Sequence, residues 1–149
     1  VGCGMALGAK ISKRKYFTYV LMGDGECNEG TVWEAALFAS SKKIKNLIAI
    51  IDYNKWQGIG RTNKVINLEP LHQKWKSFGW NLFIINGHNP SKIISTIKKI
   101  KKIKNSKPSV IIANTIKGKG IDFMEDDNNW HYRIPTQSEI EIVKKKLNI

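Results

Sequence analysis

The chain has 149 residues, of which 42% are hydrophobic and 25% are charged, so it is long and apolar enough to bury one compact core. This composition excludes a disordered tail, a collagen-like chain and a repeat array. Apolar runs such as Leu47 to Ile51 are far shorter than the roughly 20 residues that span a bilayer. We therefore expect a single domain over residues 1–149 and no membrane partner.

The net charge is +13, from 25 basic and 12 acidic residues. Such an excess raises the hypothesis of a basic nucleic-acid-binding domain, but 22 of the basic residues are lysines, whereas recognition of bases and phosphates favours arginine. The lysines of residues 98–104 alternate with isoleucines at three- and four-residue spacing, which is typical of an amphipathic helix with a solvated face. We predict no nucleic-acid partner, because net charge is the one observation in favour of that alternative.

The two cysteines, Cys3 and Cys27, are too few and too isolated for a disulfide framework or a four-ligand zinc site. No basic-then-apolar leader is visible, so we expect a reduced protein of the cytoplasm. The sequence begins at Val1 without a methionine, inside a pattern of apolar residues that includes Met5 and Ala9 and is typical of a helix. We therefore expect a domain that is truncated at the amino terminus.

Short apolar strands alternate with amphipathic helices along the chain. The residue patterns predict strands at 16–22, 47–51, 82–85 and 110–114, helices at 33–39, 70–78, from 89 onward and at 137–147, and a loop at 117–135. Thr136 and Glu139 stand at the spacing of a capping box. This alternation predicts an α/β fold, a parallel sheet with helices on both faces. Trp33 and Trp56 are expected in the core.

Two polar residues directly follow the first two predicted strands. These are Asp24 and Asn54, which lie 30 positions apart. In a parallel α/β sheet, ligands bind beyond the carboxyl ends of the strands, and one crossover brings these two positions together. The spacing of Gly23, Gly25 and Gly30 is not the dinucleotide pattern, and the phosphate loop GxxxxGK[ST] does not occur. Because Mg²⁺ favours carboxylate and amide oxygens together with phosphate, the pair predicts a metal-bridged diphosphate.

Three stretches then resemble one known family. The sequence GDGECNEGTVWEA at 23–35 and the motif DYNKWQ at 52–57 resemble the thiamine-diphosphate signature that begins with GDG and ends in Asn. The segment KPSVIIANTIKGKGIDFMEDDNNWH at 107–131 resembles a transketolase segment that ends in a Trp-His pair. From about Met5 to its end, the chain resembles transketolase, specifically the amino-terminal subunit of the split two-chain form.

The resemblance implies a thiamine-diphosphate-binding fold with Mg²⁺ at the diphosphate. It implies Asp24 and Asn54 as side-chain ligands of the metal and the backbone carbonyl of Trp56 as the third protein ligand. Gly25 would lie against the diphosphate, where the lack of a Cβ permits close approach. The ordinary alternative is that Asp24 and Asn54 are turn residues. Where the family commonly has a bulky aliphatic residue under the cofactor, this chain has Gln57.

The resemblance also implies catalytic and cofactor-binding roles. His131 would lie at the mouth of the cofactor site and contact the substrate, and Lys117 would be a cofactor-side lysine. Glu29 would meet the neighbouring subunit and take part in a proton relay. The ordinary alternatives are a first-turn helix acid for Glu29 and a surface lysine for Lys117. His72 and His88 lack such a context and are interpreted as structural or surface residues.

The implied function is the transfer of a two-carbon ketol unit from a ketose to an aldose, with sugars or sugar phosphates as substrates. The implied partner is a carboxy-terminal transketolase subunit that supplies the aminopyrimidine-binding domain in a heterotetramer, without which this chain would be inactive. Two other thiamine-diphosphate enzymes, the first component of 2-oxoacid dehydrogenases and deoxyxylulose-phosphate synthase, share the GDG-to-Asn signature and remain alternatives. A non-catalytic, partner-binding subunit is a further alternative.

Overall fold

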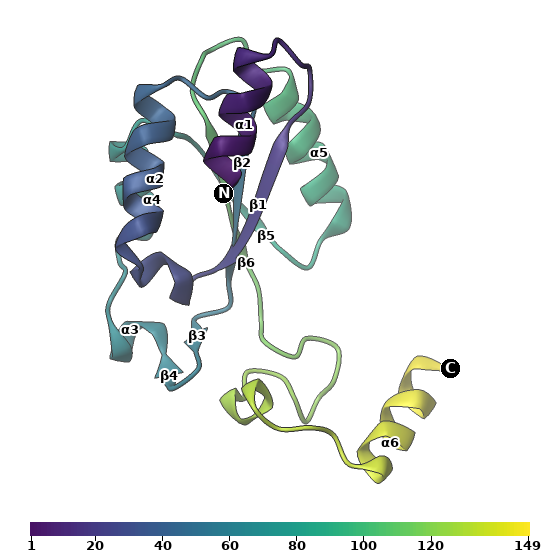
Figure 1. The fold of residues 1–149 in the computed structure, drawn as a ribbon. Coiled ribbons are helices and arrows are strands. Elements are labelled where there is room, and N and C mark those ends of the chain that lie inside the picture. The colour runs from purple at the N-terminus through teal and green to yellow at the C-terminus, as the bar shows by residue number, and fades with distance from the viewer.

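A computed structural model describes residues Val1–Ile149, and Figure 1 shows its ribbon. At its centre is a sheet of four parallel strands in the order β1-β2-β6-β5. The strands are β1 (Thr18–Gly23), β2 (Leu47–Tyr53), β5 (Asn81–Asn86) and β6 (Ser109–Asn114). Each overlaps a strand expected from the sequence, so the predicted parallel α/β sheet is confirmed.

The strand register aligns the ends of the strands at one edge of the sheet. Gly23, the last residue of β1, pairs with Asp52, and Tyr53 at the end of β2 pairs with Asn114 at the end of β6. The residues that follow β1, β2 and β6 therefore leave the sheet at its carboxyl edge. This edge is where a parallel α/β sheet binds its ligands.

Helices cover both faces of the sheet, as predicted. They are α1 (Gly2–Ile11), α2 (Gly30–Ser41), α4 (Leu71–Ser77) and α5 (Pro90–Lys101), whereas α6 (Gln137–Leu147) lies away from the sheet and has no buried residue. Residues of α1, α2 and α4 pack into one hydrophobic cluster with β2 and β6, while α5 packs on the opposite face. Figure 1 shows α2 and α4 together on one side of the sheet and α5 on the other. No helix combines the length and apolar character needed to cross a membrane.

An aromatic cluster fills the core between α2 and α4. The ring of Trp75, which is 1% exposed, lies with its centroid 5.3 Å from that of Trp33 and 4.9 Å from that of Trp80. The indole N–H of Trp80 donates a hydrogen bond of 2.9 Å to the carbonyl of Ala36. Offset and edge-on aromatic pairs of this kind add to the stabilisation from burial. The expectation that Trp33 packs in the core is confirmed.

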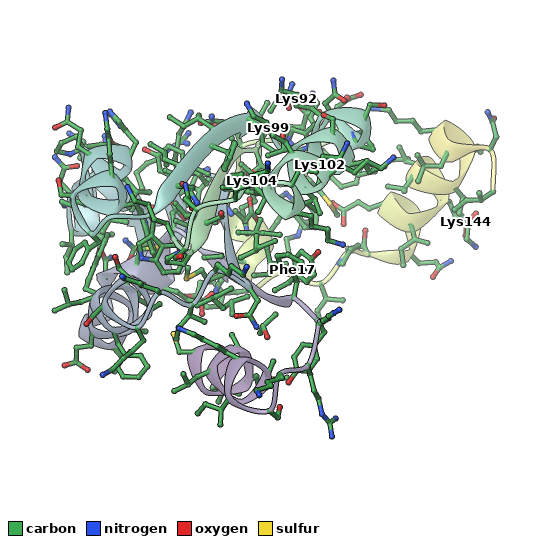
Figure 2. All side chains as sticks on the ribbon, turned by 90° about the horizontal axis from the view of Figure 1, so that it is seen from above. Phe17, Lys92, Lys99, Lys102, Lys104 and Lys144 are labelled. Atoms are coloured by element: carbon green, nitrogen blue, oxygen red, sulfur yellow. The ribbon has the colours of Figure 1, made fainter.

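The helix α5 has the amphipathic character that its isoleucine and lysine spacing predicts. Ile100 belongs to the buried cluster on this face of the sheet, and the partly buried Ile93 and Ile97 pack against it. The side-chain oxygen of Asn89 accepts a hydrogen bond of 2.9 Å from the backbone N–H of Lys92, which caps the first turn. Lys92, Lys98 and Lys99 of this helix are exposed, and Figure 2 labels two of them, Lys92 and Lys99. The lysine run is therefore a solvated helix face.

Several short elements were not predicted from the sequence. They are η1 (Gly25–Asn28), β3 (Trp56–Gln57), β4 (Gly60–Arg61), α3 (Thr62–Val65) and η2 (Asn128–His131). Elements of two to four residues are too short to show a periodic pattern of apolar residues. In the sequence they cannot be distinguished from loops. The element η2 lies inside the segment 117–135, which was expected to be a loop throughout.

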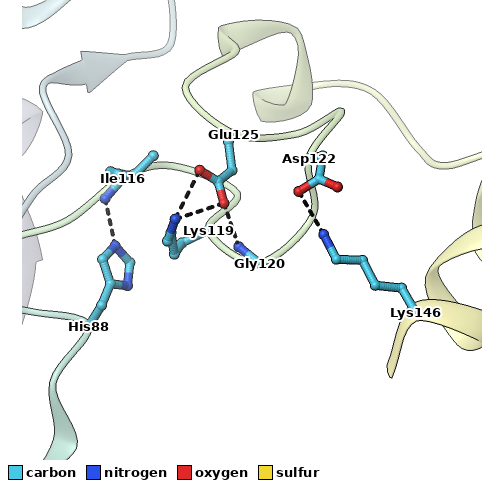
Figure 3. Close-up of polar contacts among 7 residues, drawn as sticks. All are labelled: His88, Ile116, Lys119, Gly120, Asp122, Glu125 and Lys146. Carbon is cyan, nitrogen blue, oxygen red and sulfur yellow. Dashed lines mark hydrogen bonds and ion pairs between the residues drawn. The ribbon is translucent and has the colours of Figure 1, made fainter. Parts of the chain in front are cut away.

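Residues 115–149, here called the C-terminal arm, leave the carboxyl edge of the sheet and end in α6, drawn in yellow in Figure 1. Figure 3 shows polar contacts of the arm. Nε2 of His88 accepts a hydrogen bond of 2.7 Å from the backbone N–H of Ile116. The ammonium of Lys119 lies 3.0 Å from the carboxylate of Glu125. His88 therefore has the structural role that the sequence analysis gave it.

Candidate functional site

Asp24 follows β1 and is fully buried. One carboxylate oxygen accepts a hydrogen bond of 3.1 Å from the backbone N–H of Gly25, and the other accepts one of 2.8 Å from the hydroxyl of Thr62. Burial raises the pKa of this carboxyl group above its ordinary value, and the hydrogen bond from Thr62 offsets part of that shift. No basic side chain forms an ion pair with Asp24. A buried carboxylate without a cation is costly, and a bound metal ion compensates it.

Asn54 follows β2 and shapes the adjacent turn. Its side-chain oxygen accepts a hydrogen bond of 2.8 Å from the backbone N–H of Trp56, and Lys55 between them has a left-handed backbone with φ 68°. An Asx turn of this kind is a common way to reverse the chain after a strand. The backbone N–H of Asp24 donates to the carbonyl of Asp52 on β2 at 3.2 Å. The turns that carry Asp24 and Asn54 are thus held at one edge of the sheet, as predicted.

Gly25 lies against the side chain of Gln57. A Cβ built on Gly25 would come 3.0 Å from Cγ of Gln57, so a side chain at residue 25 would displace this neighbour. The side-chain nitrogen of Gln57 is buried and has no hydrogen-bond partner in the chain. A buried N–H donor without a partner in the chain can take an acceptor from a ligand. The indole N–H of Trp75 in the core is likewise unpaired. The position of Gln57 next to the Asp24 turn suits a phosphate oxygen as its acceptor.

A polar contact, here called the latch, joins the β3–β4 hairpin to the C-terminal arm. The carboxylate of Asp126 accepts a hydrogen bond of 2.9 Å from the indole N–H of Trp56 and two from the guanidinium of Arg61, at 2.8 and 2.5 Å. The guanidinium also stacks on the indole ring, 3.8 Å from its centroid. The expectation of a core position for Trp56 is therefore wrong, because its side chain is half-buried and belongs to this polar contact.

His131 lies on η2 and is exposed. The C-terminal arm places His131 beside the β3–β4 hairpin. Nε2 of His131 lies 3.5 Å from the position that a Cβ on Gly58 would take. The side-chain amide of Asn128 donates a hydrogen bond of 3.0 Å to the carbonyl of Gly58, which fixes this approach. Lys117 lies three residues beyond the end of β6 and is half-buried, with no hydrogen bond from its ammonium within the chain.

Glu29 stands apart from these residues. It is the N-cap residue of α2, and its exposed side chain makes no hydrogen bond or ion pair within the chain. The structure thus places the turns of Asp24 and Asn54 at the same carboxyl edge of the sheet. The hairpin that follows Asn54 lies next to His131. Glu29 is left facing solvent, with its carboxylate unpaired.

No role was predicted for Thr62, Arg61 or Asp126, and Gln57 was noted only as a departure from the family. Thr62 is 38 residues from Asp24, and Asp126 is 65 residues from Arg61, so no local period connects either pair. The one sequence signal for the latch is that Arg61 is among the few arginines of a lysine-rich chain. A single planar guanidinium among many lysines is a reason to look for a bidentate carboxylate partner.

The arrangement has the chemistry of a site for Mg²⁺ and a diphosphate. A buried carboxylate, a neighbouring amide oxygen and a backbone turn provide few, hard oxygen donors, which leaves room for water and phosphate oxygens around the metal. The unpaired N–H donor of Gln57 and the close approach at Gly25 are compatible with a phosphate group at the same turn. The residues present therefore fit the group that the sequence predicts.

Comparison with known families identifies the class of protein that this fold and site define. Residues 7–149 match the family described as transketolase, thiamine diphosphate binding domain. Because the match covers nearly the whole chain, the chain belongs to this family and carries its thiamine-diphosphate-binding domain.

Two curated relatives of the chain are named as subunits of particular transketolases. The chain is 45% identical over 141 residues to a protein of Phocaeicola vulgatus that is named as one of the subunits of apulose-4-phosphate transketolase, a match that covers 95% of this chain and 50% of the relative. It is 46% identical over 122 residues to a Clostridium protein that is named as one of the subunits of 6-deoxy-6-sulfo-D-fructose transketolase, covering 82% of this chain and 44% of the relative. The chain spans about half the length of the curated relatives it matches.

Solved structures confirm the fold. The transketolase of Campylobacter jejuni superposes with a TM-score of 0.92 at 28% identity, over 99% of this chain and 24% of that one. The Pichia stipitis transketolase in complex with sedoheptulose-7-phosphate gives a TM-score of 0.90, also at 28% identity, over 99% of this chain and 23% of that one. The described sheet, hairpin and arm together form a transketolase-like thiamine-diphosphate-binding domain.

Proposed function

We propose that this chain is the thiamine-diphosphate- and Mg²⁺-binding subunit of a split transketolase, which transfers a two-carbon ketol unit from a ketose to an aldose. The names of the two relatives favour this activity over the 2-oxoacid dehydrogenase and deoxyxylulose-phosphate synthase alternatives, since both are subunits of transketolases. The two free cysteines, one of them buried, support a reducing compartment such as the cytoplasm.

The observation that carries the proposal is the fully buried carboxylate of Asp24, which has hydrogen-bond donors but no cation beside it. In the proposed holoenzyme, Asp24 and Asn54 supply side-chain oxygens to Mg²⁺, and Trp56 supplies its backbone carbonyl. The metal would neutralise both the buried carboxylate and the diphosphate. Gly25 lies at the turn where the diphosphate would bind and allows the close packing of Gln57, which donates its unpaired N–H to the diphosphate.

Bound thiamine diphosphate supplies the carbon nucleophile and the electron sink that ketol transfer requires. The residues of this chain would bind the cofactor and orient the donor sugar. His131, held at the hairpin by its neighbour Asn128, donates a hydrogen bond to an oxygen of the donor sugar where negative charge develops. The half-buried Lys117 adds positive charge on the cofactor side of the site.

A second type of chain completes the proposed site. The unpaired carboxylate of Glu29 at the start of α2 is free to contact that chain and to exchange a proton across the interface. The partner is proposed to be a carboxy-terminal transketolase chain with the aminopyrimidine-binding domain, in a heterotetramer. The relatives' names point to ketoses that carry a phosphate or a sulfonate as the substrate class.

The test is ketol transfer by the complex of this chain with its carboxy-terminal partner. We expect activity that requires thiamine diphosphate and Mg²⁺ and is absent from the isolated chain. His131→Ala should lower turnover about 100-fold, the usual cost of removing one such donor, while the affinity for thiamine diphosphate changes little. His72→Ala is the matched control, because His72 is half-buried on α4 and makes no side-chain hydrogen bond. Parental turnover in His131→Ala would remove this residue from the site.

A further inference from the structure

The amino-terminal edge of the sheet carries a cavity that the proposed function does not use. It has a volume of about 520 Å³ and lies where α1, α2 and α5 end, on the side of the sheet opposite to Asp24. We call it the basal pocket. Figure 2 views the molecule from this end and shows Phe17, one of the lining residues, between the ribbons of α1 and α5.

The lining of the basal pocket is strongly basic. Of its 17 lining residues, 8 are lysine or arginine and none is acidic. They come from three walls: Lys13 and Arg14 follow α1, Lys45 follows α2, and Lys101 and Lys107 lie at the end of α5 and beyond it. A concave site with one sign of charge focuses the field and attracts ligands of the opposite sign.

These cations are not neutralised within the chain. No acidic residue occurs in the segments 1–23, 35–51 and 70–121, which supply all the lining residues. All five ion pairs of the chain involve residues outside the pocket. The carbonyl ends of three helices contribute a partial charge of about −0.5 each. This falls far short of eight formal positive charges.

The backbone of the pocket is nevertheless fixed. The side chains of Asn81 and Asn105 exchange hydrogen bonds of 2.9 and 3.1 Å, which holds the segment after α5 against β5. The amide nitrogen of Asn46 donates to the carbonyls of Ala6 and Tyr16, at 3.0 and 3.3 Å. The ammonium of Lys10 is already used, since it donates to carbonyls at the end of α2. The other basic side chains of the pocket make no hydrogen bond. The backbone segments that carry them are fixed by the hydrogen bonds of Asn46, Asn81 and Asn105.

We propose that the basal pocket binds a small, multiply charged polyphosphate anion. Cations on three walls around one cavity suit several phosphate groups joined in one compact molecule. The cavity has the size of a small-molecule site and is not an extended basic groove of the kind that follows a nucleic-acid backbone. This site lies at the opposite end of the sheet from the proposed cofactor site and does not depend on the proposed function.

The test is calorimetric titration of the chain with inorganic tripolyphosphate, without Mg²⁺ and at about 0.15 M salt, the physiological ionic strength. The triple variant Arg14→Gln, Lys45→Gln, Lys107→Gln removes one cation from each wall. We expect it to bind at least about tenfold more weakly, because a single charge-assisted hydrogen bond is worth about that factor. The control triple variant Lys92→Gln, Lys102→Gln, Lys144→Gln changes the net charge equally outside the pocket and should bind within about threefold of the parent.

Three results would overturn the proposal. These are no binding of tripolyphosphate by the parent chain, equal weakening by both triple variants, and tighter binding of a short single-stranded or duplex oligonucleotide that both triple variants weaken. The second and third results would show that anions bind to the overall positive charge of the chain and not to the basal pocket. Because all the substituted side chains are exposed, both variants should keep the parental melting temperature. Asp24→Ala should keep the affinity for tripolyphosphate, which separates this site from the proposed cofactor site.

Discussion

The sheet and the C-terminal arm are stabilised by different interactions. The central strands β2 and β6 are mostly apolar and buried, as is typical of parallel strands covered on both faces. Polar contacts at or near the surface join the arm to the rest of the chain, namely the latch around Asp126 and the hydrogen bond from Ile116 to His88. Within the arm, Lys146 pairs with Asp122. No residue of α6 is buried. Hydrophobic burial therefore holds one region, and exposed polar pairs hold the other.

This difference divides the proposed site into two parts. Asp24 and Asn54 stand on strand ends that the core fixes, so the metal-binding part is set as soon as the sheet folds. His131 depends on the latch and on the hydrogen bond from Asn128 to Gly58. Exposed ion pairs contribute little stability, with typical values below about 1 kcal/mol. The part of the site that would contact the sugar is thus held much more weakly than the part that would hold the diphosphate.

The largest expected effect is in the core of the sheet. Trp75→Ala removes a side chain that is 1% exposed and packs against Trp33 and Trp80. Truncating such a residue costs about 3–5 kcal/mol in the free energy of unfolding. Urea denaturation measures this loss. The control Leu37→Ala, at a side chain 60% exposed on α2, should change the free energy by less than about 0.5 kcal/mol. Similar losses in the two variants would contradict the assignment of the core.

The second effect concerns the latch. Asp126→Ala removes the acceptor of both Trp56 and Arg61, so the arm should separate from the hairpin while the sheet stays folded. We expect amide hydrogen exchange at residues 117–131 to increase about fivefold or more, with a change of at most about 1 kcal/mol in global unfolding. Glu141→Ala, which breaks an ion pair inside α6, is the control. Unchanged exchange in the arm of Asp126→Ala would contradict a role for the latch.

The smallest effect is a pH dependence confined to the arm. The hydrogen bond from Arg61, followed by that from Trp56, lowers the pKa of Asp126 below its ordinary value of 3.8. A carboxyl group with a lowered pKa stabilises the folded arm above its ordinary pKa and loses this contribution as the pH falls through the lowered value. The NMR signal of the Trp56 indole N–H should therefore shift below pH 3.8, and Asp126→Asn should abolish the shift. The buried indole of Trp80, bonded to a backbone carbonyl, should not follow this titration.

Much of this architecture could be predicted from the sequence. The apolar runs located the four parallel strands, the isoleucine spacing predicted α5, and Thr136 with Glu139 forms the expected capping box of α6. The positions of Asp24 and Asn54 at one sheet edge followed from their place directly after two strands. The hairpin and the latch could not be predicted, because a bidentate pair such as Arg61 and Asp126 is fixed by the tertiary fold and leaves no periodic pattern. The same reason explains why Trp56 was wrongly expected in the core.

The stability of the metal-free protein offers an independent check on Asp24. Asp24→Asn keeps an oxygen for the hydroxyl of Thr62, loses the hydrogen bond from the backbone N–H of Gly25, and removes a buried charge that lacks a cation. Replacing an uncompensated buried charge by a neutral group of the same shape is neutral or stabilising. We therefore expect this variant to melt at the parental temperature or above it without Mg²⁺. A loss of cofactor binding in this variant could then not be attributed to a loss of folding.

In the proposed site, Asp24 holds the metal that binds the diphosphate. The most direct measurement is the affinity for thiamine diphosphate of the complex with the carboxy-terminal partner, titrated at a Mg²⁺ concentration that saturates the parent. We predict that Asp24→Asn weakens this affinity about 100-fold or more, because the diphosphate loses the cation that neutralises it, whereas Glu34→Gln, an exposed acid on α2, leaves it unchanged. Parental affinity of Asp24→Asn at the same Mg²⁺ concentration would contradict this role of Asp24.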